Sequence, residues 1–330
     1  RADDTASVWE SRSSPTLNGK SSSFDGLFLF LSTNLFLFYS LCFPFFSIFA
    51  LKLETMRELL IRTVSGIVLL IILLGCLYFA SSGAFSLLLL FIVAVGTFEM
   101  FRLHGLQGNS HFVLGEFCSL GFYVISTLVA VKLLAPKFLS LDLIFLMIPF
   151  LHALFSKQFD FKHVASFHYG SMLFLSFPAA LLNYMLSHDF QLELFGSYLG
   201  AGLILLVFSL LWTNDIFAYL TGRLLGKHKL FERISPGKTI EGSLGGLFFT
   251  VLGMCIFCHF ADWMPFSIGV GLAVVAVVFG TLGDLCESML KRQAGVKDSG
   301  NLIPGHGGIL DRFDSIMFSV PFVFTYLLLI

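Results

Sequence analysis

Carboxylate and hydroxyl side chains recur at helical spacing in the last third of the chain. Asp284 and Ser288 are four residues apart, and Asp311 and Asp314 are three apart, so each pair would present its oxygen atoms on one face of a helix. Oxygen-only ligand sets suit Mg²⁺, which takes one or two carboxylates and completes its coordination with water and phosphate oxygens. Carboxylates gathered in a low-dielectric site would repel one another unless a divalent cation neutralised them. We therefore expect a magnesium site at these acids.

The stretch between these two pairs is rich in cationic residues and glycines. The cations are Lys291, Arg292 and Lys297, with Arg312 directly after Asp311, and the glycines are Gly300, Gly305, Gly307 and Gly308. Cationic side chains suit phosphate, and glycines let backbone N–H groups approach an anion closely. His306, between two of the glycines, could hydrogen-bond a phosphate or act as an acid, and packing is its alternative role. Metal-binding acids beside phosphate-binding bases indicate phosphoryl or nucleotidyl transfer.

Two alternatives explain the same acids without that chemistry. In the first, the carboxylates only form structural ion pairs with Lys291, Arg292 and Arg312. In the second, the chain is an ion-coupled transporter whose intramembrane acids line an ion path. Asp215 and Asp284 lie in otherwise apolar runs, where an acid costs roughly 2.5 to 3.5 kcal/mol, so both require a polar cavity or a cation. The transporter hypothesis leaves the basic, glycine-rich stretch unexplained.

The composition indicates whether the elements that hold these residues lie in water or in lipid. Of 330 residues, 56% are hydrophobic and 12% charged, with a mean hydropathy of +0.88, whereas a soluble domain carries roughly 25% charged residues. A soluble globular enzyme is thereby excluded. The net charge of −1 also argues against a nucleic-acid partner, which would require a basic excess.

Nine apolar runs are long enough to cross a membrane as helices. They are approximately residues 59–80, 84–101, 111–131, 139–155, 165–186, 197–220, 243–261, 266–290 and 312–330, and a further Phe-rich run occupies 27–50. We predict an all-α, polytopic integral membrane helical bundle with about nine core transmembrane helices, to which the run at 27–50 could add one. The acids are unevenly spread over it, because nine lie between residues 214 and 314, whereas Glu99, Glu116, Asp142 and Asp160 are the acids of the first five runs and their loops.

Basic residues in short loops favour the cytoplasm. The loop after the sixth run holds Arg223, Lys227, Lys229, Arg233 and Lys238, and the loop after the eighth holds Lys291, Arg292 and Lys297. Both loops are therefore predicted to face the cytoplasm, with the 187–196 loop outside. Lys132 and Lys137 disagree with this topology, because they fall on the outer side.

The chain divides into three parts by composition. Residues 1–55 form an N-terminal extension, Ser-rich and polar at first, which could be an appended segment without a catalytic role. Residues 56–199 supply the first transmembrane helices, and residues 200–330 form the catalytic transmembrane region with two cytoplasmic loops. Met56, Arg57 and Glu58 would make an ordinary bacterial start.

Two stretches in the second half of the chain carry closely spaced polar residues and glycines. The stretch from Ser288 to Asp314 reads SMLKRQAGVKDSGNLIPGHGGILDRFD, and that from Asn214 to Gly246 reads NDIFAYLTGRLLGKHKLFERISPGKTIEGSLGG. The first resembles the signature of the phosphatidate cytidylyltransferases (CDP-diacylglycerol synthases), and the second resembles an upstream block of that family. The resemblance is strong over roughly residues 200–320, only hydropathic over 59–199, and absent from residues 1–55.

The resemblance implies a Mg²⁺-dependent transfer of CMP from CTP to phosphatidate, which yields CDP-diacylglycerol and diphosphate. By the same resemblance, Asp284, Asp311 and Asp314 would hold the metal, a second cation would lie beside it, and Lys291, Arg292 and His306 would complete the catalytic set. The substrate-binding set it implies is Ser288, Lys238, Arg223, Asn214, Asp215, Lys297 and Arg312. The protein would be integral to a bacterial inner membrane, with its active site facing the cytoplasm.

A related CTP-dependent lipid enzyme is the main alternative to that reaction. A polyprenol kinase would transfer the γ-phosphate of CTP and release CDP, and a cytidylyltransferase could use a different lipid. Besides CTP, phosphatidate and membrane lipid, a second copy of the chain is a candidate partner, but no residue pattern specifies a homodimer.

Overall fold

The computed structural model describes residues 56–79, 83–106, 110–155, 161–195, 200–261, 264–305 and 307–330. The N-terminal extension, including the run at 27–50, lies outside the described residues. The helices are α2 (Met56–Tyr78), α3 (Ala84–Leu103), α4 (Ser110–Ala130), α5 (Ser140–Phe155), α6 (Phe161–Ser171), α7 (Phe177–Met185), α8 (His188–Phe195), α9 (Gly202–Leu225), α10 (Ile240–Phe260), α11 (Phe266–Gln293) and α12 (Leu310–Leu328). The strands are β1 (Lys229–Phe231) and β2 (Ser235–Thr239), which pair as an antiparallel hairpin.

The helices confirm the predicted all-α membrane bundle. Within the described residues, six helical stretches are long and apolar enough to span a bilayer, and the bent pair of residues 166–185 and 188–195 makes up to seven. Helices satisfy their own backbone hydrogen bonds in lipid, which is why apolar runs of this length become helices there. Helices α2 and α12 overlap the first and ninth predicted runs. That all nine runs cross the membrane stays a prediction.

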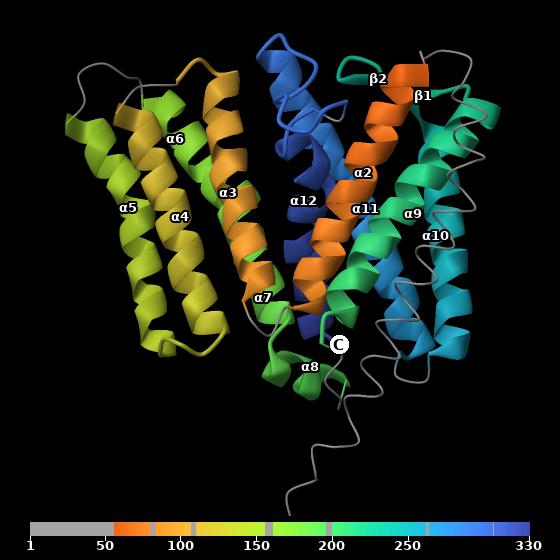
Figure 1. Cartoon of the computed structure of the whole chain (residues 1–330), viewed down its shortest axis with the longest axis horizontal. Coiled ribbons are helices and arrows are strands. Elements are labelled where there is room, and N and C mark those ends of the chain that lie inside the picture. Colours follow the sequence, from red (N-terminus) through yellow and green to blue (C-terminus); the bar gives the residue numbers. More distant parts are fainter. Residues whose placement is uncertain are drawn as a thin grey trace, which may run out of the picture.

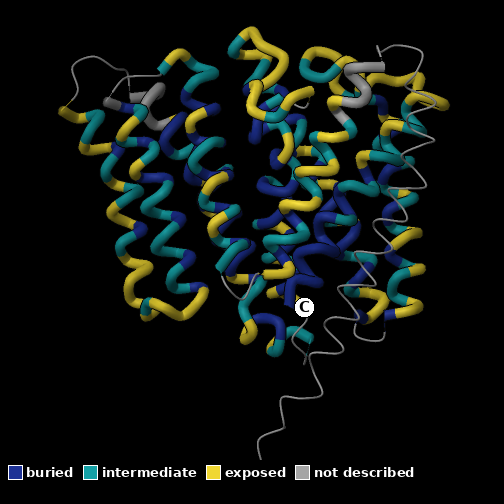
Figure 2. The backbone as a smooth tube through the Cα atoms, in the orientation of Figure 1, coloured by how far each residue is buried: buried dark blue, intermediate teal, exposed yellow. Residues whose placement is uncertain are grey.

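The helices form two groups with α12 between them (Figure 1). Helices α3 to α7 lie on one side of α12, and α2, α9, α10 and α11 lie on the other. Helix α12 contacts α3 and α7 as well as α9 and α11. Figure 2 shows the buried backbone concentrated in this central region and many exposed residues on the outer helices. Apolar side chains such as Leu143, Leu154 and Phe248 are exposed on outer helices, as expected for surfaces that face lipid rather than water.

The span made of α6 and α7 changes its helical pitch halfway. Residues Met172–Ser176 form a π-helical turn between the two α-helices, and Pro178 lies at the start of α7. Proline has no N–H and its ring crowds the preceding turn, so the hydrogen-bond pattern shifts there. The span ends at Met185, and α8 begins three residues later at an angle of 65°. We expected a loop over 187–196, but buried Phe190 and Gln191 tie residues 188–195 to the bundle as a short helix.

Helices α9 and α10 approach each other closely through glycines. A Cβ atom at Gly242 would lie 3.0 Å from Gly222 Cα and would overlap the carbonyl oxygen of Ala218. Thr239 Oγ1 accepts a hydrogen bond from Gly242 N (3.1 Å) and thereby caps the start of α10. The β-hairpin between the two helices is consequently held against both of them, which places β2 beside the charged residues of α9 and α11.

Both basic loops lie at the same end of the bundle. The hairpin and the 294–309 connection are found at the upper end in Figure 1, near the beginning of α2, and α8 is found at the opposite end. At that opposite end Lys132 forms an ion pair with Asp189. Of the two basic residues that disagreed with the predicted topology, Lys132 is therefore neutralised by an acid from α8, whereas no acid among the described residues pairs with Lys137.

Candidate active site

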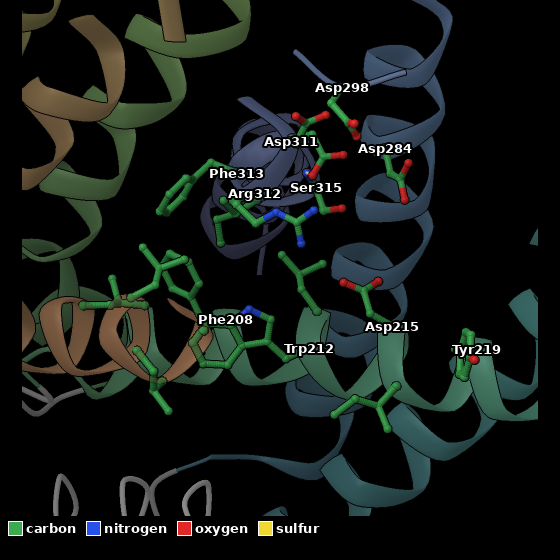
Figure 3. Close-up of a pocket in the computed structure, with 18 of the residues that line it drawn as sticks. Phe208, Trp212, Asp215, Tyr219, Asp284, Asp298, Asp311, Arg312, Phe313 and Ser315 are labelled. Carbon is green, nitrogen blue, oxygen red and sulfur yellow. The ribbon is translucent and has the colours of Figure 1, made fainter. Parts of the chain in front are cut away.

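A cavity of about 520 Å³ opens among the carboxylates predicted to do chemistry. Its polar wall consists of Asp215 on α9, Asp284 and Lys291 on α11, Asp298 in the following loop, and Asp311, Arg312 and Asp314 on α12. Figure 3 shows Asp215 and Asp284 on neighbouring helices, with Arg312 between α12 and that pair. The opposite wall is apolar and consists of Leu69, Leu70 and Leu73 on α2 and Phe208, Leu211 and Trp212 on α9. We call this amphiphilic space the carboxylate cavity.

A second cavity of about 520 Å³ lies between the hairpin and helices α9, α10 and α11. Its lining is mainly small or polar: Asn214, Asp215, Ala218, Tyr219, Gly222, Arg223, Ser235, Gly237, Lys238, Thr239, Gly242, Ser243, Thr281 and Asp284. We call it the hairpin cavity. Asp215, Tyr219 and Asp284 line both cavities, so the two spaces meet at these side chains.

An ion pair marks this junction. Lys238 Nζ on β2 lies 2.5 Å from Asp284 Oδ2 on α11, and the two side chains are 26% and 35% exposed. Asp284 Oδ1 accepts a hydrogen bond from Ser288 Oγ (3.2 Å), one helical turn later. The predicted spacing therefore does bring Asp284 and Ser288 together, and the hairpin adds a base that sequence spacing could not place.

Asp215 and Asp314 add negative charge around Asp284. Asp215 lines both cavities together with Asp284, and Asp314 lines the carboxylate cavity. Asp314 is buried, and its Oδ1 accepts a hydrogen bond from Ser315 N (2.7 Å). Among the described residues, none forms an ion pair with Asp215 or with Asp314. These two acids therefore do not fit the alternative in which every carboxylate has a structural ion-pair partner.

Asp311 is used differently from the other acids. Its Oδ2 accepts hydrogen bonds from Ser299 N (2.9 Å) and Gly308 N (2.8 Å), and Ser299 Oγ lies 3.0 Å from it. Its Oδ1 lies 2.6 Å from Lys291 Nζ, and Lys291 also forms an ion pair of 2.5 Å with buried Glu287. For Asp311 the ion-pair alternative therefore describes the structure. The metal-ligand role of Asp311 stays a prediction.

The glycine-rich stretch directs its backbone N–H groups toward protein carboxylates. Gly308 N donates to Asp311, as described above, and Gly307 has a left-handed φ of 83°, which glycine adopts without strain. A Cβ at Gly307 would overlap Asp311 Oδ2. Close approach to an anion was predicted for these glycines, and at Gly307 and Gly308 the anion is a side chain of α12.

The remaining predicted residues lie around the two cavities. Asn214, Lys238 and Arg223 line the hairpin cavity, and Arg223 Nη1 donates to Tyr219 Oη (2.7 Å). Arg292 lines neither cavity and instead donates to the carbonyls of Ile234 (3.2 Å) and Val296 (2.8 Å), which joins the hairpin to the loop after α11. Lys297 is exposed and lines neither cavity. His306 lies outside the described residues.

The donor chemistry fits a hard divalent cation bound together with substrate. Asp215, Asp284 and Asp314 offer only oxygen atoms, the ligands that Mg²⁺ prefers. Across the part of the chain that the structure describes, no group of three or more His, Cys, Asp or Glu side chains is placed to hold a metal ion by itself. Mg²⁺ commonly takes one or two carboxylates and relies on substrate phosphates for further ligands, so these acids suit an ion that arrives with a nucleotide.

Several residues at the site were not predicted. Glu99 on α3 contacts the loop after α11, Glu287 pairs with Lys291, and Trp212 and Tyr219 line the cavities. An acid inside a spanning segment is a functional candidate by default, and that signal applied to Glu99 as much as to Asp215. The sequence did not show which residue Glu99 contacts, because its partner Ser299 lies 200 residues later in the chain.

The sequence is similar to a known protein family over most of its length. The model of the cytidylyltransferase family matches residues 60–330. A phosphatidate cytidylyltransferase of Staphylococcus aureus (strain COL) is 51% identical over 123 residues, which are 37% of this chain and 47% of that protein. A phosphatidate cytidylyltransferase of Staphylococcus haemolyticus is 49% identical over 126 residues, with the same shares covered. The chain thus spans about half the length of the curated relatives it matches.

The family match includes all the helices that carry the two cavities, from α9 to α12, and nearly all of α2. This chain belongs to the cytidylyltransferase family.

Proposed function

We propose that the chain transfers the CMP group of CTP to phosphatidate, giving CDP-diacylglycerol and diphosphate. A phosphate oxygen of the lipid would attack the α-phosphorus of CTP, and the bond from that phosphorus to the bridging oxygen of the β-phosphate would break. Diphosphate leaves with the electron pair. The lipid phosphate is already a nucleophile, so the protein needs only to align the two substrates and stabilise the charge that develops on diphosphate.

The junction of the two cavities is the observation that carries this proposal. The carboxylate cavity has an apolar wall, which suits a hydrocarbon tail, and a charged wall. The carboxylates of that wall would receive an anionic head through a bound cation, with Lys291 and Arg312 as the bases beside it. The hairpin cavity offers Lys238 and Arg223 for the triphosphate, and the hairpin that lines it lies at the end of the bundle where the basic loops gather. Two substrates bound in these cavities would bring their phosphates together at Asp215 and Asp284.

The acids at the junction would hold the divalent cation, for which Mg²⁺ is the proposed ion. When bound, it would neutralise phosphate charge during the transfer. Asp284 and Asp215 would be its main ligands from the cavity wall, with Asp314 beside them and Asp311 as the family resemblance implies. A second cation and an orientation with the site facing the cytoplasm of a bacterial inner membrane belong to the same proposal. So do roles for Ser288 beside Asp284 and for Lys291, Arg292, Lys297, Arg312 and His306 toward phosphate.

Incubation of the purified protein with CTP labelled at the α-phosphate, phosphatidate and Mg²⁺ tests the reaction. We expect the label to be extracted with the lipid, diphosphate to be released, and a chelator of divalent cations to stop both. Release of CDP with transfer of the γ-phosphate would instead identify a lipid kinase. Ion flux in liposomes without CTP turnover would identify a transporter. Either of these two outcomes overturns the proposal.

Replacement of Lys238 by methionine is expected to lower kcat/KM for CTP by about 10- to 100-fold, the effect of one charge-assisted hydrogen bond of about 1.5 to 3 kcal/mol. Lys238 is within ion-pair distance of Asp284 and would exchange that partner for the triphosphate. The matched control is Lys227→Met, which removes the same charge from an exposed position just before β1 that lines neither cavity. Equal kinetics in the two variants would contradict the proposed triphosphate contact.

A further inference from the structure

Glu99 is a buried acid that reaches from the first half of the bundle to the loop before α12. The residue is only 2% exposed. Its Oε1 accepts a hydrogen bond from Ile309 N (3.1 Å), and its Oε2 accepts from Leu310 N (2.9 Å). The first N–H groups of a helix have no acceptor within the helix, and no side chain of the N-cap residue fulfils this role at α12. The carboxylate of Glu99 therefore caps α12 from a different helix, where the helix dipole also favours a negative charge.

Arg102, three residues after Glu99, holds the same loop by a second contact. Its Nη2 donates to the carbonyl oxygen of Ser299 (2.8 Å). Ser299 is fully buried, and its hydroxyl lies 2.9 Å from Glu99 Oε2 and 3.0 Å from Asp311 Oδ2, so its single hydrogen is donated to one of the two carboxylates. Ser299 N donates to Asp311 as described above. Every polar atom of Ser299 is thus bound by α3 or α12.

Two glycines of the loop leave the room that the Glu99 carboxylate occupies. A Cβ atom at Gly300 would overlap Glu99 Oε1, and one at Gly308 would overlap both oxygens of the same carboxylate. Gly300 and Gly308 also approach each other, because a Cβ at Gly300 would lie 3.1 Å from Gly308 Cα. The space that these glycines leave is filled by Glu99 rather than by a ligand.

We infer that Glu99 and Arg102 are positioning residues for the proposed cytidylyl transfer, on which this inference rests. Neither side chain lines the carboxylate cavity or the hairpin cavity. Together they hold Ser299, Ile309 and Leu310, near the two ends of the loop. They thereby place the first turn of α12, which carries Asp311, Arg312 and Asp314 into the cavity wall. The first half of the bundle thereby contributes to the reaction through the loop, without contact to substrate.

Replacement of Glu99 by glutamine tests the inference. Glutamine keeps the size of the side chain but exchanges one acceptor oxygen for an NH₂ group, which cannot accept from an N–H donor. We expect kcat to fall by about 10- to 100-fold, since a displacement of about 1 Å at the reacting groups has an effect of that order. KM for CTP should change little, because Lys238 and Arg223 in the hairpin cavity are untouched. We also expect faster hydrogen exchange at residues 298–310 in the absence of substrates.

Two further variants separate positioning from general stability. Glu116→Gln is the matched control, because Glu116 is a partly buried acid on α4 whose Oε2 has no hydrogen-bond partner among the described residues; it should leave kcat and loop exchange unchanged. Arg102→Lys should keep most of the activity, since lysine can donate to Ser299 O, whereas Arg102→Met should resemble Glu99→Gln.

Unchanged kcat in Glu99→Gln overturns the inference. It is also overturned if Glu99→Gln and Glu116→Gln lose activity and thermal stability in parallel, without faster exchange confined to the loop. Hydrogen exchange does not depend on which reaction the protein catalyses. Absence of CDP-diacylglycerol formation by the unmodified protein would therefore reject the proposed function, while the exchange data would still decide whether Glu99 holds the loop.

Discussion

Asp284→Asn is expected to reduce CTP-dependent turnover by at least about 10²- to 10³-fold, the range found when one preorganised electrostatic contact is removed, while the protein still folds and inserts. Asp284 lines both cavities and pairs with Lys238. Its loss removes the charge that would bind the cation and leaves the lysine without its carboxylate at the point where the two substrate phosphates would meet. Because the Asp284 side chain is 35% exposed, water can solvate the asparagine, and we expect the unfolding midpoint in detergent to change little.

This variant is tested by measuring how much label from CTP is extracted with the lipid at a series of Mg²⁺ concentrations. The remaining activity should require more Mg²⁺ than the unmodified protein does, because one ligand is missing. Asp142→Asn provides the control: Asp142 is a buried acid on α5 that accepts a hydrogen bond from Ser126 (2.6 Å) and lines neither cavity. It should retain normal turnover. Full activity in Asp284→Asn would refute the proposed cation site.

Asp311→Asn is expected to abolish activity for a different reason and to destabilise the protein as well. Asp311 Oδ2 accepts hydrogen bonds from the backbone N–H groups of Ser299 and Gly308 and lies 3.0 Å from Ser299 Oγ, while Asp311 Oδ1 pairs with Lys291. The NH₂ group of asparagine must face either the lysine ammonium or the backbone N–H groups of Ser299 and Gly308, and none of these can accept a hydrogen bond. The Asp311 side chain is only 4% exposed, and breaking a buried pair of this kind costs about 3 to 5 kcal/mol.

Thermal unfolding and limited proteolysis between residues 294 and 309 measure this effect, with Asp284→Asn as the comparison. We expect a lower midpoint and faster cleavage in Asp311→Asn only. A native midpoint together with lost turnover would instead favour direct binding of the cation by Asp311, as the family resemblance implies. Native turnover would contradict both roles.

Much of the architecture could be predicted because the membrane simplifies the problem. Nine apolar runs coincide in position with described helices, since a backbone in lipid must satisfy its own hydrogen bonds and a helix is the local way to do so. Some contacts within the site were also predictable, because they join residues that are close in the sequence. Ser288 lies one turn after Asp284 and hydrogen-bonds to it, because residues four apart on a helix are neighbours.

Contacts between distant parts of the chain were not predictable in this way. The spacing of Asp311 and Asp314 places both at the beginning of α12, but it does not reveal that Asp311 is occupied by Ser299, Gly308 and Lys291. The glycines of the loop suggested an anion, and the sequence alone could not distinguish a phosphate from the carboxylates of Asp311 and Glu99. Hydropathy likewise placed Glu99 in a span without indicating what it faces.

The amino-acid sequence by itself determined that the protein is a helical membrane bundle and where its scarce charges lie along the chain. Both properties depend on short-range physics: the length of an apolar run against the thickness of a bilayer, and the periodicity of a helix. Only the tertiary structure decided which charges meet. Lys238 reaches Asp284, and Glu99 reaches the start of α12, because helix packing brings together residues that are 46 or more than 200 positions apart, and no local pattern encodes those distances.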